Sequence, residues 1–489
     1  HLVVKADGYM VSVWENGQLV QHGNLEHHPE LRHRALHGWL GFQDHGGWTR
    51  FRDIRLLEAP AGTGLDVWHE TPPRNVADVI DRVMNPWLLA RDDGIASGTV
   101  SKTIAEAEPG EHVLAELTGP GAVVRFAQDM PEGKLAFYFD GEEKPRIEVK
   151  PNQLRGAVPQ MSDYSNPVVT CLAYAKGLRI VLRDAQQGAC RIDYVTVPSE
   201  YDVRTFTGPG VSLPRGWPDC VVYRQLKYRY GDYRNPGILP RSSSDKETLA
   251  PGATEPVLAV DGAGIVRYVR LRMEQQLLQN NNLWLAVTVD GESEPAVSAP
   301  VRFWLAGLTG PKNYYNLVNF SRNGLGLTQA MPFGNGITFS LRNAGDQPIK
   351  NIAVEVCVEP AEGDRAKEVA AMMRLRGAFL PAGEGGRSLA HYAGAGRLIA
   401  IACESLGGNE TGIAEMVIDG AVQDGWAAPN LDLLLGQSGD FQTTLSGRAG
   451  SMAWRYFWLA PVGFSQSLDL TGTAESLGGR LALFYAKQR

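Results

Sequence analysis

Four aromatic residues in the C-terminal part of the chain, Trp426, Trp454, Tyr456 and Trp458, are of the types that stack on sugar rings. The run WRYFWL at 454–459 places Trp454, Tyr456 and Trp458 on one face of a strand, because alternate residues of a strand share a face. An aromatic stripe of this kind indicates either a sugar-binding face or, more often, core packing. Both interpretations stay open, and the four residues are the candidate substrate-binding residues.

Other motifs that commonly carry chemistry do not occur in the sequence. It contains no GxSxG nucleophile motif, no HExxH zinc motif and no Walker loop. Seven of the 10 His residues lie within the first 45 positions, among them His27, His28, His33 and His37. Their spacing fits no metal-ligand pattern and favours a solvated loop. We therefore expect neither a metal nor a cofactor.

Composition narrows the class of protein. A chain of 489 residues with 44% hydrophobic and 21% charged residues is globular and long enough for several domains. Its net charge of −7 gives no basic surface for nucleic acid, and no apolar run approaches the ~18 residues of a membrane span. The five Cys residues show no CxxC spacing; Cys171 and Cys190 could face each other across a hairpin, but buried free thiols are the favoured interpretation.

The elements that must position any site repeat along the chain. The segments at 109–126 and 251–268 share a Pro-Gly start, an apolar strand and then Gly-x-Gly-x-[Val/Ile]-Val-Arg-aromatic, and AGAGRLIAI at 393–401 is a shorter echo. Each copy is followed by a strand that ends in Asp-Gly, a pair that favours hairpin turns; the pairs begin at Asp140, Asp290 and Asp419. Repeats of ~100 residues indicate separate sandwich domains rather than a solenoid.

The sequence thus predicts an all-β chain with three tandem jelly-roll or β-sandwich units, at 109–207, 245–360 and 385–489. Connectors join them. A short helix is expected near 76–93 within the connector 61–108, a linker at 208–244, and a connector helix at 362–376 within 361–384.

Residues 1–60 carry a different signature, with WENG at 14–17, GFQDHGG at 41–47 and FRDIRL at 51–56. This region resembles the C-terminal half of the laminin-G-like sandwich numbered 1080 among the domains of unknown function, a family that includes 3-keto-sugar hydrolases. The resemblance implies a partial sandwich. We expect its strands to leave an open sheet edge or an exposed apolar face, because half a sandwich cannot bury its own core.

Residues 105–489 resemble the family numbered 2961 among the domains of unknown function, which includes glycoside hydrolase family 172. The resemblance rests on LTGPGAVVRF, FYFDGEEKP and YAKGLRIVL in the first unit, and on GAGIVRYVRL and MPFGNGITFSLRN in the second. It implies tandem jelly rolls that assemble as trimers or multiples of them. It also implies exo-acting, retaining hydrolysis of α-linked fructofuranose or arabinofuranose.

The same resemblance implies a pair of carboxylates in the last jelly roll, since retaining glycosidases use two of them about 5.5 Å apart. Aligned on Asp419, the nucleophile position of the family falls on Thr411, with Glu410 one residue away. In LLGQSGDF at 434–441 the acid position falls on Asp440, whose side chain is one methylene shorter than that of Glu. The candidate pair is therefore Glu410 as nucleophile and Asp440 as acid/base.

Two functions remain open. One is a carbohydrate-active hydrolase resembling the retaining α-fructofuranosidases and α-arabinofuranosidases, with a degraded or relocated acid pair. The other is a non-catalytic protein that binds glycan or assembles into an oligomer, layer or filament. In both cases the expected partners are carbohydrate and further copies of the chain, in an extracellular or periplasmic location.

Overall fold

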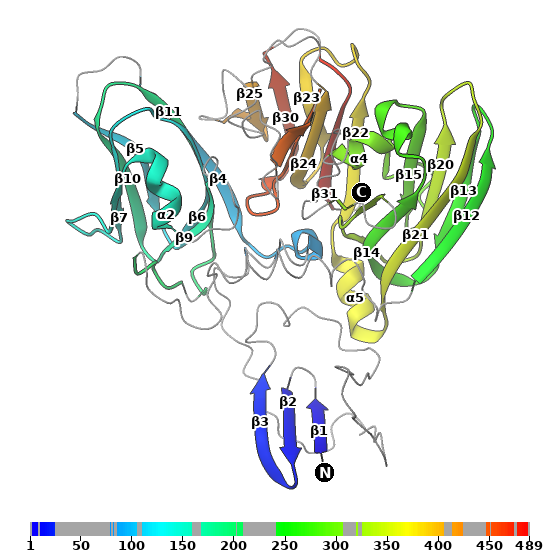
Figure 1. The fold of residues 1–489 in the computed structure, drawn as a ribbon, viewed down its shortest axis with the longest axis horizontal. Coiled ribbons are helices and arrows are strands. Elements are labelled where there is room, and N and C mark those ends of the chain that lie inside the picture. Colours follow the sequence, from blue (N-terminus) through cyan, green and yellow to red (C-terminus); the bar gives the residue numbers. More distant parts are fainter. Residues whose placement is uncertain are drawn as a thin grey trace. The chain divides into compact units, whose positions relative to one another are not determined.

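The structure is a computed structural model, and it describes residues 2–7, 10–24, 79, 82, 86–104, 110–158, 168–201, 203–208, 241–306, 319–320, 325–404, 413–423, 446–449, 451–473 and 477–487. The chain divides into two compact units, His1–Pro73 with Gly237–Leu239, and Arg74–Pro236 with Pro240–Arg489. Antiparallel strands dominate the described residues, as the all-β prediction requires (Figure 1).

In the first unit, three strands form one antiparallel sheet in the order β1 (Leu2–Asp7), β2 (Met10–Glu15) and β3 (Gln18–Asn24). Asn16 and Gly17 make the turn between β2 and β3 with φ of 50° and 82°, the left-handed conformation that an Asn-Gly hairpin favours. Val4 and Val20 are 58% and 54% exposed, so apolar side chains reach the surface of this sheet. The GFQDHGG and FRDIRL segments lie outside the described residues.

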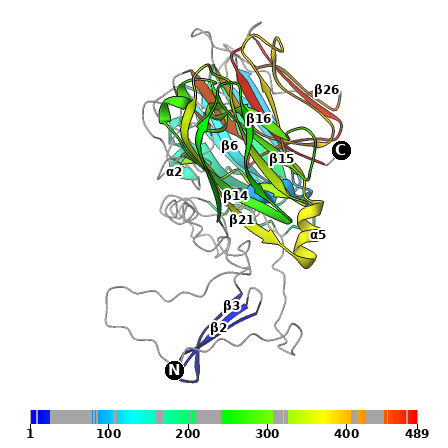
Figure 2. The same ribbon diagram turned by 90° about the vertical axis from the view of Figure 1, so that its right-hand side faces the viewer.

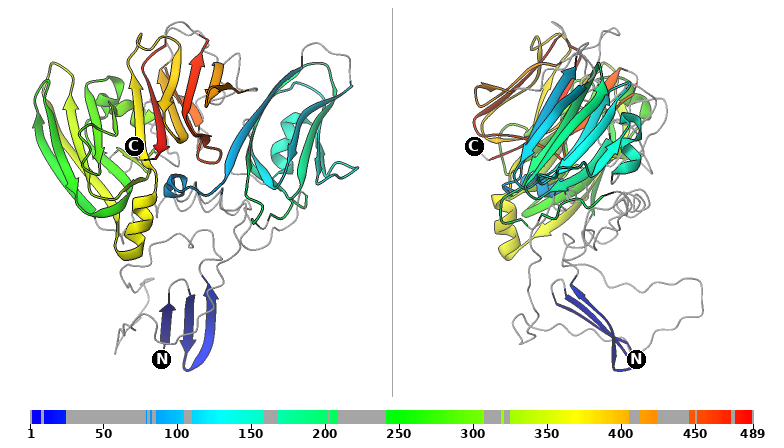
Figure 3. Two further views of the ribbon diagram at one scale, coloured as in Figure 1. Left: turned by 180° about the vertical axis from the view of Figure 1, so that it is seen from behind. Right: turned by 90° about the vertical axis from the view of Figure 1, so that its left-hand side faces the viewer.

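The first sandwich of the second unit has two four-stranded sheets (Figure 3). One has the order β5 (Gly110–Thr118), β10 (Gly177–Ala185), β7 (Lys134–Phe139) and β8 (Ile147–Val149). The other has the order β4 (Ala96–Ile104), β11 (Gly188–Thr196), β6 (Gly121–Asp129) and β9 (Val168–Tyr174). Strand β10 shows why they pack: Leu178 and Ile180 point into the core and Arg179 points out. Two short helical turns follow β8, η3 (Pro151–Gln153) and α2 (Leu154–Ala157).

The second sandwich repeats this plan. Its smaller sheet has the order β13 (Thr254–Val260), β20 (Ile337–Asn343), β15 (Leu283–Val289) and β16 (Val297–Pro300). Its larger sheet has the order β12 (Arg241–Leu249), β21 (Ile349–Ala361), β14 (Ala263–Arg272), β18 (Leu325–Leu327) and β17 (Asn319–Phe320), with β19 (Met331–Phe333) also paired to β14. Two short helices lie between strands, η4 (Gln275–Gln279) and α4 (Val301–Trp304).

The third sandwich has the same plan of one smaller and one larger sheet. Its smaller sheet has the order β23 (Ser388–Ala393), β30 (Ser467–Gly472), β25 (Ile413–Ile418) and β26 (Ala421–Val422). Its larger sheet has the order β22 (Arg374–Leu380), β31 (Arg480–Ala486), β24 (Gly396–Glu404), β28 (Met452–Tyr456) and β27 (Ser446–Ala449), with β29 (Val462–Phe464) also paired to β24. One four-stranded sheet of each sandwich thus has the same strand order, namely β5-β10-β7-β8, β13-β20-β15-β16 and β23-β30-β25-β26, and this is the repeat that the sequence predicts.

The Asp-Gly pairs occupy the same turn in each sandwich. Asp140, Asp290 and Asp419 have φ of 51°, 54° and 53°, each followed by a Gly with positive φ. Each carboxylate accepts hydrogen bonds from backbone N–H groups of the loop that precedes the central strand β10, β20 or β30. Their conformation and contacts give these residues a structural role.

Helices are short in the described part of the chain, and none has the length and apolar character that a membrane span needs. Helix α5 (Gly363–Ala371) contacts β14 and β21, and Figure 2 shows it beside these strands. It ends before the expected residue 376, because Met372 is already extended and β22 begins at Arg374. Upstream, η2 (Pro86–Ala90) is buried and precedes β4.

Candidate functional site

Three of the six predicted site residues, Glu410, Trp426 and Asp440, lie outside the described residues. Trp454, Tyr456 and Trp458 are described, and they are only 1%, 6% and 0% exposed. The ring centroids of Tyr456 and Trp458 are 5.9 Å apart. The three side chains do come together, but inside the molecule.

Strand β28 and the residues after it are covered on both faces. Trp454 and Trp458 belong to a hydrophobic cluster that includes Val124 and Val169 of the first sandwich. Phe457 instead joins the core of the third sandwich, together with Ala453. This burial supports core packing, and no ring face of the stripe is open to a sugar in this chain.

Arg455 lies between these aromatic residues and reaches the first sandwich. Its guanidinium donates a hydrogen bond of 2.5 Å to the Asp193 carboxylate on β11. Arg125 on β6 donates to the same carboxylate at 3.2 Å, and the Thr99 hydroxyl on β4 donates at 2.8 Å. Arg191 completes the group, with its Nε 3.4 Å from Asp193. Three arginines thus surround one carboxylate, and the four charged residues are at most 6% exposed.

The electrostatics of this cluster favour the charged carboxylate. Burial by itself would raise the pKa of Asp193, but Arg455, Arg191 and Arg125 hold it well below its usual range. Burial and the neighbouring Arg455 lower the pKa of Arg125 to about 9. A cavity of about 20 Å³ adjoins the cluster, lined by both charged and apolar residues. It has room for one water molecule and not for a sugar ring.

The sequence carried a signal for this cluster that pattern reasoning missed. Arg125, Arg191 and Arg455 each lie in a strand of mostly apolar residues, where a buried charge requires a partner. Asp193 is that partner, on a strand whose other residues alternate between the core and the interface. The cluster joins the first and third sandwiches.

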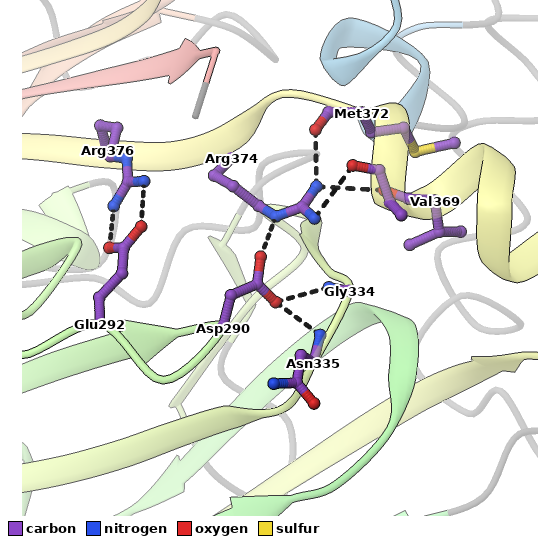
Figure 4. Close-up of polar contacts among 9 residues, drawn as sticks. Asp290, Glu292, Gly334, Asn335, Val369, Met372, Arg374 and Arg376 are labelled. Carbon is purple, nitrogen blue, oxygen red and sulfur yellow. Dashed lines mark hydrogen bonds and ion pairs between the residues drawn. The ribbon is translucent and has the colours of Figure 1, made fainter. Parts of the chain in front are cut away.

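A second buried ion pair joins the second sandwich to α5 and β22 (Figure 4). Asp290 accepts a hydrogen bond of 2.6 Å from Arg374 and bonds of 2.6 and 2.7 Å from the backbone N–H groups of Gly334 and Asn335. Arg374 also donates to the carbonyls of Val369, Met372 and Ala370 at the end of α5, where a cation is favourable. Beside them, the Arg376 guanidinium donates two hydrogen bonds to the Glu292 carboxylate.

Other acids of the third sandwich have structural partners. Glu404 accepts a hydrogen bond of 2.9 Å from Arg302 of the second sandwich. Asp419 accepts bonds from the backbone N–H groups of Ser465, Gln466 and Ser467, which lower its pKa to about 2. Glu415 is exposed on β25.

The described cysteines are buried, and this limits the chemistry of their thiols. Cys171, Cys190, Cys357 and Cys403 are buried free thiols, while Cys220 lies outside the described residues. Burial raises the pKa of Cys171 and of Cys190 to about 12. Within the described ranges, no three His, Cys, Asp or Glu side chains are grouped so as to hold a metal ion.

Comparison with known proteins links the first two sandwiches to a family. Residues 81–212 match the model of the GH172 first β-sandwich domain, and residues 240–356 match the GH172 domain-like model. No curated protein matches the chain. The 1080-type resemblance of residues 1–60 stays a prediction.

Among solved structures, the major capsid protein P2 from bacteriophage PM2 aligns at 13% identity with a TM-score of 0.31, over 51% of this chain and 99% of that chain. The STIV major capsid protein aligns at 9% identity with a TM-score of 0.16, over 54% of this chain and 95% of that chain.

Proposed function

We propose that this chain, which belongs to the GH172-like family, is a carbohydrate-active protein that removes terminal α-linked furanosyl residues with retention of configuration. The observation that carries the proposal is the match of two successive sandwiches to models of that family. The repeated fold supports it, because the third sandwich shares the strand order of the two matched ones.

Glu410 and Asp440 are the proposed catalytic pair. In the first step the Glu410 carboxylate attacks the anomeric carbon, while Asp440 gives its proton to the departing oxygen. In the second step Asp440 takes a proton from water, which displaces Glu410 and releases the sugar. The hydrogen bonds of Glu404 to Arg302 and of Asp419 to its turn support this choice, since each of these acids has structural partners.

Hydrolysis of aryl α-arabinofuranoside and aryl α-fructofuranoside tests the proposal. The parent should be active, and Glu410→Gln or Asp440→Asn should each lower kcat by about a thousandfold. Glu415→Gln is the matched control, because Glu415 is an exposed acid on β25 and lies close to Glu410 in the sequence. Activity that survives both substitutions would place the site elsewhere.

A second candidate function is glycan binding or self-assembly without catalysis. The observation that favours it is the departure at the two family positions, which carry Thr411 and the shorter Asp440. A one-residue offset reverses the face of a strand, and a displacement of ~1 Å can cost ~100-fold in rate. Under this alternative the parent binds polysaccharide and hydrolyses neither aryl substrate.

Both candidates include a homo-oligomer, proposed as a trimer or a multiple of one. A stable contact of this kind buries about 800 Å² on each partner. Light scattering at micromolar concentration tests it, and a monomer would contradict it.

A further inference from the structure

A small cavity lies where the first sandwich meets the third, beside the Asp193 carboxylate. Its volume of about 20 Å³ is enough for one occupant of about the size of a water molecule. Among the described residues, three charged ones line it, namely Arg125 and Asp193 of the first sandwich and Arg455 of the third. The rest of its wall is apolar or aromatic and includes Val124 from the first sandwich and Leu459 from the third.

The two arginines of this wall share one carboxylate oxygen. Arg125 donates to Oδ2 of Asp193 at 3.2 Å, and Arg455 donates to the same atom at 2.5 Å. The other oxygen, Oδ1, accepts from the Thr99 hydroxyl at 2.8 Å and lies 3.4 Å from Nε of Arg191. The single negative charge of Asp193 is therefore shared by three guanidiniums, and two of these line the cavity.

Burial makes this sharing unfavourable for the arginines. Arg125 and Arg455 are only 6% and 4% exposed, so water does little to stabilise their charges. Burial, followed by the neighbouring Arg455, lowers the pKa of Arg125 to about 9, and burial lowers the pKa of Arg191 to about 10. Asp193 therefore does not restore the usual pKa of either arginine. A second negative charge close to Arg125 and Arg455 would reduce the repulsion between them.

The cavity is a place where such a charge can lie. A guanidinium carries five N–H donors, so a side chain that donates to Asp193 can also donate to a second acceptor. The ring of Phe457, which also lines the cavity, holds Arg455 in place, with its centroid 4.3 Å from the guanidinium carbon. The apolar part of the wall keeps the local dielectric constant low, and this strengthens the attraction between an anion and the two guanidiniums.

We propose that this cavity binds a chloride ion, held by Arg125 from one sandwich and by Arg455 from the other. Chloride is close to water in size, whereas sulfate and phosphate are too large for a volume of about 20 Å³. A cation is disfavoured because the wall contains two guanidiniums and one carboxylate. Since the two arginines belong to different sandwiches, the ion stabilises the contact between the sandwiches, and this effect does not depend on the proposed catalytic activity.

Thermal unfolding of the full chain in sodium chloride and in sodium gluconate, at matched ionic strength, tests the proposal. Gluconate is too large for the cavity, so the two salts screen charges equally and only chloride can occupy the site. A ligand that binds the folded state alone raises the unfolding temperature, here by about 2–4 °C, and the rise should saturate with chloride concentration. Bromide should replace chloride, and anomalous diffraction from a bromide-soaked crystal should show the ion beside Arg125 and Arg455.

Two variants separate occupation of the cavity from a general effect of salt. Arg455→Met removes one of the two guanidiniums, and Ala460→Val adds volume at the cavity wall while it leaves every charge in place. Each should abolish the difference between the two salts, and the second variant keeps the test valid if the first does not fold. Arg272→Met, in the exposed pair with Asp245, is the control and should respond to chloride as the parent does.

Three results would overturn the assignment. One is an equal unfolding temperature of the parent in the two salts. Another is a chloride response that Arg455→Met and Ala460→Val retain in full, because that is a general effect of salt. The third is a soaked crystal in which the cavity holds water and no bromide.

Discussion

Arg455 donates a hydrogen bond of 2.5 Å to Asp193, although 262 residues separate the two in the chain. The contact connects the aromatic strand β28 of the third sandwich with β11 of the first. Both side chains are buried, so neither can exchange its partner for water. The aromatic stripe and this ion pair together form part of the contact between the two sandwiches, which β4 and β29 also make.

Asp193→Asn should destabilise the protein strongly, because it leaves three buried guanidiniums around a neutral amide. Breaking a buried pair typically costs about 3–5 kcal/mol, and urea unfolding of the parent and the variant measures the difference. Asp245→Asn is the matched control: its partner Arg272 is exposed, and an exposed pair contributes roughly 0–1 kcal/mol. Equal effects of the two substitutions would contradict the assigned role of Asp193.

Asp290 and Arg374 should be energetically coupled. Asp290→Asn and Arg374→Met should each be destabilising, and the double variant should be more stable than the sum of the two losses predicts. The reason is that each single change leaves a buried partner unsatisfied. A double-mutant cycle in urea measures the coupling, which we expect at about 1–3 kcal/mol. Additive losses would show that the pair does not act as a unit.

Acid should remove the contribution of Asp419. Its backbone hydrogen bonds lower its pKa to about 2, whereas an unfolded Asp titrates near ~3.9. The folded pKa is depressed, so the stabilisation is complete above pH ~4 and is lost as the pH falls toward about 2. Asp419→Asn keeps a residue suited to the turn, with its φ of 53°, and removes only the charge. The difference in unfolding midpoint between parent and variant should therefore shrink below pH ~4, and a constant difference would contradict the assignment.

Buried thiols should resist alkylation in the folded protein. Burial raises the pKa of Cys171 and Cys190 to about 12, so little thiolate is present at pH 8. Mass spectrometry after N-ethylmaleimide treatment should find both residues unmodified without denaturant and modified in guanidinium chloride. Rapid modification of either residue under native conditions would show that its strand opens.

Local chemistry accounts for what the sequence predicted well. Asn16-Gly17 and Asp290-Gly291 fix their turns through backbone conformations that these residue types favour, so the hairpins and the repeat could be read directly. The sequence pattern predicts a helix to residue 376, but α5 ends at Ala371. Buried Met372 and the contacts of Arg374 override the helical pattern there.

The features that could not be predicted from the sequence depend on contacts between residues far apart in the chain. Nothing near Trp454 says which sheet covers it, and its burial depends on strands of the first sandwich far away in the chain. The same holds for Asp193, whose partners come from several different strands. The pair Glu410 and Asp440 came from comparison with a family pattern and stays a prediction.

The ion pair between β11 and β28 also means that the first sandwich is synthesised before all of its buried partners exist. The ribosome completes the first sandwich well before it makes Arg455, so the nascent chain presents Asp193, Arg125 and Arg191 with one arginine still to come. During that interval the apolar residues around Val124 and Val169 lack the indoles that later cover them. We expect the early sandwich to expose this apolar surface to chaperones until the last strands are translated and cover it.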